Sequence, residues 1–187
     1  MKKREHDPRR LDIERFATEG GQLSGDWPLA AMTRLVGLCD PAQPAADAQA
    51  VRWSALGERR RRPGAGSDAW LRLELDAQVR LTCQRCLAPV ETPLAVDRWF
   101  HFVEGEQQAA ELDADSEDDV LASTRAFDLQ ALAEDELLLA LPLVPRHAVC
   151  PQPLLPEGAA AAEEASLAEP ESAHPFSVLA ALKRGPH

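Results

Sequence analysis

The spacing of hydrophobic residues changes along the chain from the period of a helix to that of a strand. Residues 26–39 place hydrophobic side chains three and four positions apart, which is typical of an amphipathic helix with Asp26 as its N-terminal cap. From Val51 onward hydrophobic and polar residues alternate, which is typical of strands with one buried face. The alternation predicts strands over 51–57, 70–81 and 90–103, with a charged loop at 58–68 between the first two.

The second half of the chain is expected to be mainly loop and helix. Residues 105–119 are acidic with few hydrophobic side chains and predict a flexible loop, followed by a short strand at 120–122. Asp128–Leu141 has the strongest helical pattern, because Asp128 can cap it and Pro142 ends it. These elements predict an α+β fold: an antiparallel β-sheet meander packed against a long helix, with a flexible acidic loop and a short C-terminal helix.

Composition divides the chain into four parts. Residues 1–10 form a basic arm, 11–150 a single α+β domain, 151–172 a linker rich in Ala, Pro and Glu, and 173–187 a helical tail. The tail has hydrophobic residues at helical spacing, so it either docks on its own domain or binds in a groove of a partner.

The chain has 187 residues and a formal net charge of −11, which argues against a simple electrostatic clamp on nucleic acid. Its longest hydrophobic run, Leu137–Val144, is too short to span a bilayer, and no hydrophobic stretch follows the charged N-terminus. We therefore expect a cytoplasmic protein with no membrane partner. Thiols stay reduced there, so the four cysteines suggest metal ligands, buried thiols or redox chemistry before disulfides.

Two of these cysteines, Cys83 and Cys86, are spaced as CxxC at the end of the longest predicted strand. A hairpin turn can present both sulfurs to one ion, and tetrahedral zinc then needs two further ligands. His147 and Cys150, spaced HxxC after the predicted helix, are the candidates. The alternatives are a pair of reduced thiols kept for packing, or redox chemistry. Zinc is the only cofactor that the sequence suggests.

The order of these motifs resembles a known family. LTCQRCL at 81–87 is followed by DLQALAEDELLLALPLVPRHAVC at 128–150 and by PFSVLAALKR at 175–184. This combination is similar to the YceD family, the large ribosomal RNA subunit accumulation proteins of bacteria. The resemblance implies a non-enzymatic role in synthesis, processing or stability of 23S ribosomal RNA. It implies ribosomal RNA precursor, or rRNA-processing and ribosomal proteins, as partners.

No phosphate-binding loop, nucleophile elbow or histidine-rich metal triad occurs, so we expect neither catalysis nor a small-molecule substrate. A zinc- or thiol-dependent protein-interaction module that acts indirectly on ribosome assembly is the alternative function.

Several charged and hydrophobic residues are candidates for RNA or partner contact. Consecutive arginines can neutralise phosphates, but no aromatic residue is interleaved with them to stack on bases. An arginine at the hairpin tip either contacts phosphate or is a solvated turn residue, and the acidic residues of the predicted helix form either a solvated face or a protein-binding face. The candidates are Arg59, Arg60, Arg61, Arg62, Arg85, Glu134, Asp135, Phe176, Lys183 and Arg184.

Overall fold

The computed structural model describes residues 6–41, 49–62, 64 and 66–151. The chain divides into two units, 1–147 and 148–187. Of the second unit only 148–151 are among the described residues, so the predicted tail and nearly all of the predicted linker lie outside them. In the described residues no helix has both the length and the hydrophobicity needed to cross a membrane.

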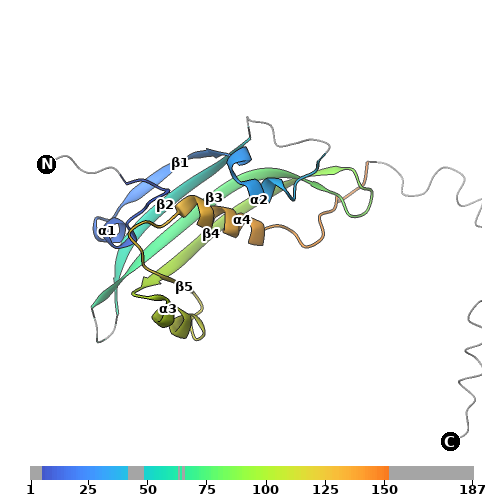
Figure 1. Cartoon of the computed structure of the whole chain (residues 1–187). Coiled ribbons are helices and arrows are strands. Elements are labelled where there is room, and N and C mark those ends of the chain that lie inside the picture. Colours follow the sequence, from blue (N-terminus) through green and yellow to red (C-terminus); the bar gives the residue numbers. More distant parts are fainter. Residues whose placement is uncertain (1–5, 42–48, 63, 65, 152–187) are drawn as a thin grey trace, which may run out of the picture. The chain divides into compact units, whose positions relative to one another are not determined.

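A five-stranded sheet, with strand order β1-β2-β3-β4-β5, forms the centre of the first unit (Figure 1). Each of the first three strands pairs antiparallel with the next, as a meander requires, whereas β5 pairs parallel with β4. The α+β class is therefore confirmed, but the sheet is mixed and not wholly antiparallel. The strands are β1 (Gln22–Pro28), β2 (Ala50–Arg61), β3 (Ser67–Thr82), β4 (Pro89–Val103) and β5 (Asp119–Ala122).

The acidic segment between β4 and β5 is not a loop throughout. It contains the helix α3 (Glu106–Asp113), whose Ala109 packs against Val103 and Val120 in a small separate core. Parallel neighbours need a crossover connection, and α3 lies in that connection. The prediction of a flexible loop is therefore wrong for these residues, because even a mostly acidic segment folds where one of its side chains has a hydrophobic surface to cover.

One face of the sheet carries the main hydrophobic core. Alternate residues of β3 from Ala69 to Leu81 are buried, except Ala77, which is half-buried, and the residues between them are exposed or half-buried. Figure 1 shows helices that lie together on one side of the sheet. They are α1 (Ile13–Thr18), α2 (Thr33–Val36) and α4 (Leu129–Leu139). At one end of the opposite face, α3 packs against Val103 of β4 and Val120 of β5, whose side chains alternate with those of the main core.

The helix α4 forms where the sequence predicts it. Asp128 accepts a hydrogen bond from the Ala131 amide at 3.0 Å and caps the helix. Leu129, Ala133 and Leu137 are fully buried along one side, as their spacing requires. At eleven residues the helix has ordinary length and is not the long helix that was predicted.

The helix predicted over 26–39 is largely wrong. Asp26 lies within β1, opposite Arg52 of β2, and only a 3-10 turn (Leu29–Ala31) and the four-residue helix α2 follow it. Pairing with β2 satisfies the backbone of 22–28, which outweighs the weak helical preference of a segment containing Gly and Pro. The helix α1, whose N-terminal cap is Asp12, was not predicted from the sequence.

Candidate metal centre

The two cysteines of the CxxC motif lie in a tight turn between β3 and β4. The Cys83 amide donates to the Ala88 carbonyl at 2.9 Å, and the Leu87 amide donates to the Cys83 carbonyl at 2.9 Å. These bonds curl the chain around Cys83 and keep Cys86 on the same turn. Leu87 closes the turn with a φ of 60°, a left-handed conformation that side chains with a Cβ disfavour.

The segment that follows α4 lies across this turn. The Gln84 amide donates to the Pro145 carbonyl at 2.9 Å, and Arg85 Nη2 donates to the His147 carbonyl at 2.9 Å. Two proline residues, Pro142 and Pro145, keep the segment extended. The chain therefore brings His147 to the cysteine turn through contacts that do not involve its ring.

The ring of His147 is oriented by a backbone carbonyl. Its Nε2 lies 2.9 Å from the Pro89 oxygen, which can only accept, so Nε2 carries the proton. Nδ1 then presents a lone pair, and it lies 3.4 Å from Cys86 Sγ. A histidine whose outer nitrogen donates to a carbonyl while the other faces the site has the arrangement that metal-binding histidines usually have.

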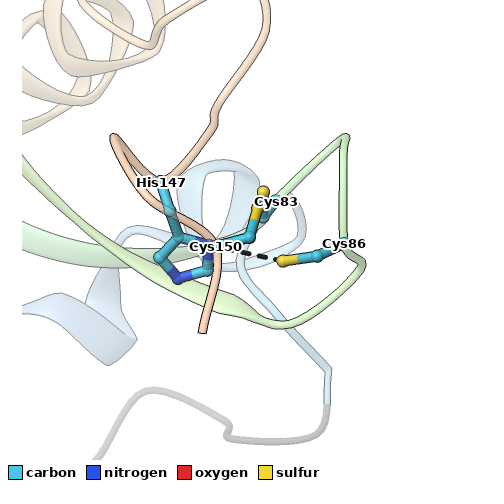
Figure 2. Close-up of side chains that lie close together, drawn as sticks. All are labelled: Cys83, Cys86, His147 and Cys150. Atoms are coloured by element: carbon cyan, nitrogen blue, oxygen red, sulfur yellow. Dashed lines mark hydrogen bonds between the residues drawn. The ribbon is translucent and has the colours of Figure 1, made fainter. Parts of the chain in front are cut away.

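Cys150 follows His147 by three residues and completes a group of four candidate ligands, shown in Figure 2. The ligand atoms of Cys83, Cys86, His147 and Cys150 all lie within 4.8 Å of one another. In a tetrahedral zinc site with these donors, neighbouring ligand atoms are about 3.5–3.8 Å apart. Small side-chain rotations would therefore suffice to enclose the ion. Three sulfurs and one imidazole nitrogen are a donor set that zinc accepts, so the residues fit this metal.

The electrostatics of the turn favour a thiolate. Cys83 is fully buried, and burial raises the pKa of its thiol, but hydrogen bonds from the Cys86, His147 and Arg85 amides lower this pKa to about 5. Thiolate is the form of cysteine that binds metal. The cysteines at this turn are free thiols, and Cys86, His147 and Cys150 are half-buried. Inert packing of Cys83 alone would not require three amides directed at its sulfur.

The four predicted contact arginines lie at the end of β2 and in the turn after it, not in a charged loop over 58–68. Arg59 pairs with Glu14, Arg60 with Glu58, and Arg62 with Asp68 at 3.6 Å. Arg61, the last residue of β2, is exposed. Three of the four arginines therefore already have carboxylate partners in the same chain.

An aromatic cluster that was not predicted from the sequence lies beside these arginines. The Arg60 guanidinium lies 4.4 Å from the ring centroid of Trp70 and 3.8 Å from that of Trp99. The rings of Trp70 and His101 stack with centroids 4.6 Å apart. Trp70 and Trp99 occupy polar positions of the strand alternation, and this irregularity was the available signal. Their contacts with Arg60 and His101 favour a structural role over base stacking.

The acidic residues of α4 do not form a solvated face, contrary to the prediction. Glu134 and Glu136 are buried and contact different arginines, Arg34 and Arg98, whereas Asp135 is exposed. They do not converge on one point, as expected for successive positions on a helix. Glu134 thus packs within the fold, and its contact with a partner stays a prediction.

The remaining candidates divide between exposed and undescribed residues. Arg85 is exposed at the hairpin tip, but its guanidinium is hydrogen-bonded across the turn to His147. Phe176, Lys183 and Arg184 lie outside the described residues.

The chain resembles one known family by its sequence. Residues 71–183, more than half of the chain, match the family described as large ribosomal RNA subunit accumulation protein YceD. The matched range includes most of β3, all of β4 and α4, and all four candidate ligands. No solved structure matches the chain.

Proposed function

Because the chain belongs to the YceD family of large ribosomal RNA subunit accumulation proteins, we propose that it is a non-enzymatic ribosome biogenesis factor. In this proposal it acts in the cytoplasm and supports the synthesis, processing or stability of 23S ribosomal RNA. The match to the family over 71–183 is the observation that carries the proposal. The contacts of the charged residues bear on how such a factor would work.

We propose that the protein acts through a partner protein, an rRNA-processing or ribosomal protein, and not by gripping RNA with its arginines. Arginines already paired with carboxylates, as Arg59, Arg60 and Arg62 are, neutralise fewer phosphates and so release fewer counterions. The net charge of −11 opposes RNA binding further. Direct contact with ribosomal RNA precursor is the competing mechanism.

A zinc-dependent interaction module is the second candidate, and the convergence of Cys83, Cys86, His147 and Cys150 favours it. Zinc would supply a permanent cross-link, with no open position for a substrate. The link would fix the β3–β4 turn to the segment after α4. The two candidates are compatible, since the zinc would hold a binding surface in shape.

The functional test is a gene deletion with complementation. We expect the ratio of mature 23S to 16S ribosomal RNA to fall in the deletion strain and to recover when the wild-type gene is restored. An unchanged ratio would refute the proposed function. The Cys83→Ser variant is tested beside the wild-type gene. We expect it to restore the ratio poorly, because it removes one of the four candidate zinc ligands.

A separate measurement distinguishes the two mechanisms. The purified chain is titrated with 23S precursor RNA at increasing salt, alongside a variant in which Arg59–Arg62 are alanine. Tight binding that weakens steeply with salt and is lost in the variant would establish direct RNA contact. Binding that is weak and equal in both proteins would support a protein partner.

A further inference from the structure

Four exposed hydrophobic side chains lie on the two segments that meet at the candidate metal centre. Leu87 is 74% exposed, Leu139 74%, Leu143 101% and Val144 51%. Within the described part of the first unit, Leu38 and Leu112 are the other large hydrophobic residues with comparable exposure. Leu87 belongs to the β3–β4 turn, and the other three belong to the end of α4 and the segment after it. We call these four residues the apolar surface.

The two segments that carry the apolar surface are fastened to each other. Gln84, three residues before Leu87, donates its amide to Pro145, the residue after Val144, at 2.9 Å. Arg85 donates to the His147 carbonyl at 2.9 Å. These hydrogen bonds join the turn that carries Leu87 to the segment that carries Leu143 and Val144, so a partner would meet a partly preformed surface.

The conformation of the apolar surface opposes the ordinary preferences of its residues. Leu87 has a φ of 60°, which leucine disfavours, and yet its side chain is mostly in water. Leu143 gains nothing from the fold, because it is fully exposed. Exposed hydrophobic side chains that gather in one place commonly mark a site of protein interaction.

The charge around the apolar surface differs from that of the chain. Residues 83–89 and 139–147 contain no Asp or Glu, whereas they contain Arg85 and Arg146, both exposed, in a chain with net charge −11. A binding partner should therefore carry acidic residues next to its hydrophobic ones. The surface has no aromatic ring on which a base could stack, so it does not suit RNA.

The tail of this chain is a poorer match for the surface than an acidic partner. Residues 173–187 contain Lys183 and Arg184 and no acidic residue, so they would place like charges beside Arg85 and Arg146. Charge complementarity thus argues against residues 173–187 as the occupant.

We propose that the apolar surface binds an amphipathic segment of a partner protein in which hydrophobic side chains are flanked by Asp or Glu. The inference rests on the proposed function, because it names the class of protein through which the chain would act. Leu87, Leu143 and Val144 would enter the hydrophobic side of the segment, and Arg85 and Arg146 would face its acidic residues.

Site-specific photocrosslinking in the cells that make the protein tests the inference. A photoreactive amino acid replaces Leu143 in the full chain, and a matched control carries it at Leu38, which is 58% exposed after α2. We expect position 143 to crosslink one protein at least ten times more than position 38 does, through a segment with more acidic than basic residues. Crosslinks to RNA, to residues 152–187 of the same chain, to a basic segment, or equally from both positions would overturn the proposal.

Binding by the crosslinked segment is then measured with purified full-length variants. The double variant Leu143→Ser and Val144→Ser should lower the affinity for this segment at least tenfold. The variant Arg146→Glu should also lower the affinity, and its effect should be larger at low salt than at high salt. Leu38→Ser should leave it unchanged. These side chains are exposed, so thermal unfolding should show that the variants fold normally; unchanged affinity in the double variant would overturn the proposal.

The ribosomal RNA assay separates this inference from the proposed function. If deleting the gene lowers the 23S to 16S ratio but the double variant restores it fully, the function stands and the apolar surface is not its site. If the deletion leaves the ratio unchanged, the function fails whatever position 143 crosslinks.

Discussion

Arg34 and Glu134, a hundred residues apart in the chain, form the contact that holds α2 against α4. Glu134 Oε1 accepts the Arg34 amide at 2.7 Å and the Leu35 amide at 3.2 Å, and Oε2 lies 3.0 Å from Arg34 Nη2. One buried carboxylate therefore satisfies the first amides of α2 and pairs with a side chain of the same helix.

Replacement of Glu134 by alanine should destabilise the fold strongly. It leaves two backbone amides without their acceptor and removes one of the two carboxylates that contact Arg34, which should cost about 2–3 kcal/mol. Urea unfolding measures the loss. The control is Asp135→Asn, since the Asp135 side chain is 52% exposed and contacts the same arginine. Equal effects from the two variants would contradict this account.

Metal removal should destabilise the protein. We expect freshly purified protein to contain one zinc ion per chain and to lose it in Cys83→Ser but not in Cys39→Ser, because Cys39 is not among the four ligands. A strong chelator should lower the unfolding temperature of wild-type protein and leave Cys83→Ser unaffected, since bound metal contributes directly to folding free energy. Metal-free protein of full stability would exclude a structural zinc.

Replacement of Leu87 by glycine should stabilise the fold. Glycine adopts the left-handed conformation without strain, and the exposed leucine side chain has little burial to lose. We expect a gain of about 0.5–1.5 kcal/mol in the free energy of unfolding. The same variant should bind the acidic partner segment more weakly. A loss of stability would mean that the leucine side chain packs within the turn.

Stability should depend on pH through Glu136. Burial raises the pKa of this carboxyl, although Arg98 partly opposes the effect, so the folded protein takes up a proton more readily than the unfolded chain. Its contribution to stability therefore improves as pH falls from neutral through the raised value toward about 4.3, the ordinary value. The free energy of unfolding is measured for wild type and Glu136→Gln at pH 7.5 and 4.5. The difference between the variant and wild type should be more favourable to the variant at pH 7.5 than at pH 4.5.

Asp97→Asn provides the matched control of opposite sign. A hydrogen bond from Arg72 lowers the pKa of Asp97, so its contribution is present at neutral pH and is lost as pH falls through the lowered value. This variant should therefore lose stability relative to wild type at pH 7.5 and approach it at low pH. If the stability change caused by each variant depended on pH in the same direction, the opposite pKa shifts of Glu136 and Asp97 would be refuted.

The three long strands and α4 could be predicted because their signals are local. Alternation over β2, β3 and β4 reflects one buried face, and Asp128 and Pro142 mark the ends of a helical segment. In contrast, β1 has few hydrophobic residues and is ordered mainly by pairing with β2. The parallel position of β5 depends on α3, whose acidic sequence carries almost no periodic signal.

The candidate site divides in the same way. The spacing of Cys83 with Cys86 and of His147 with Cys150 predicted four ligands, and the structure brings them together. The carbonyl of Pro89 that orients the His147 ring carried no sequence signal. Burial of Glu134 could not be foreseen either, because acidic residues in a helix are usually solvated, and its partner Arg34 lies in a distant segment.

Because α1, α2 and α4 cover the same face of the sheet, alternate positions of β3 should differ in how freely they can mutate during evolution. Along β3, replacements at alternate sites from Ala69 to Leu81 would disturb the interior, while those at the intervening sites would be largely silent. Saturation mutagenesis of β3 should thus show that tolerance to substitution alternates from one residue to the next. Trp70 should be an exception to this pattern. It lies at one of the intervening positions, but its ring contacts Arg60 and stacks on His101, so its replacement should be poorly tolerated.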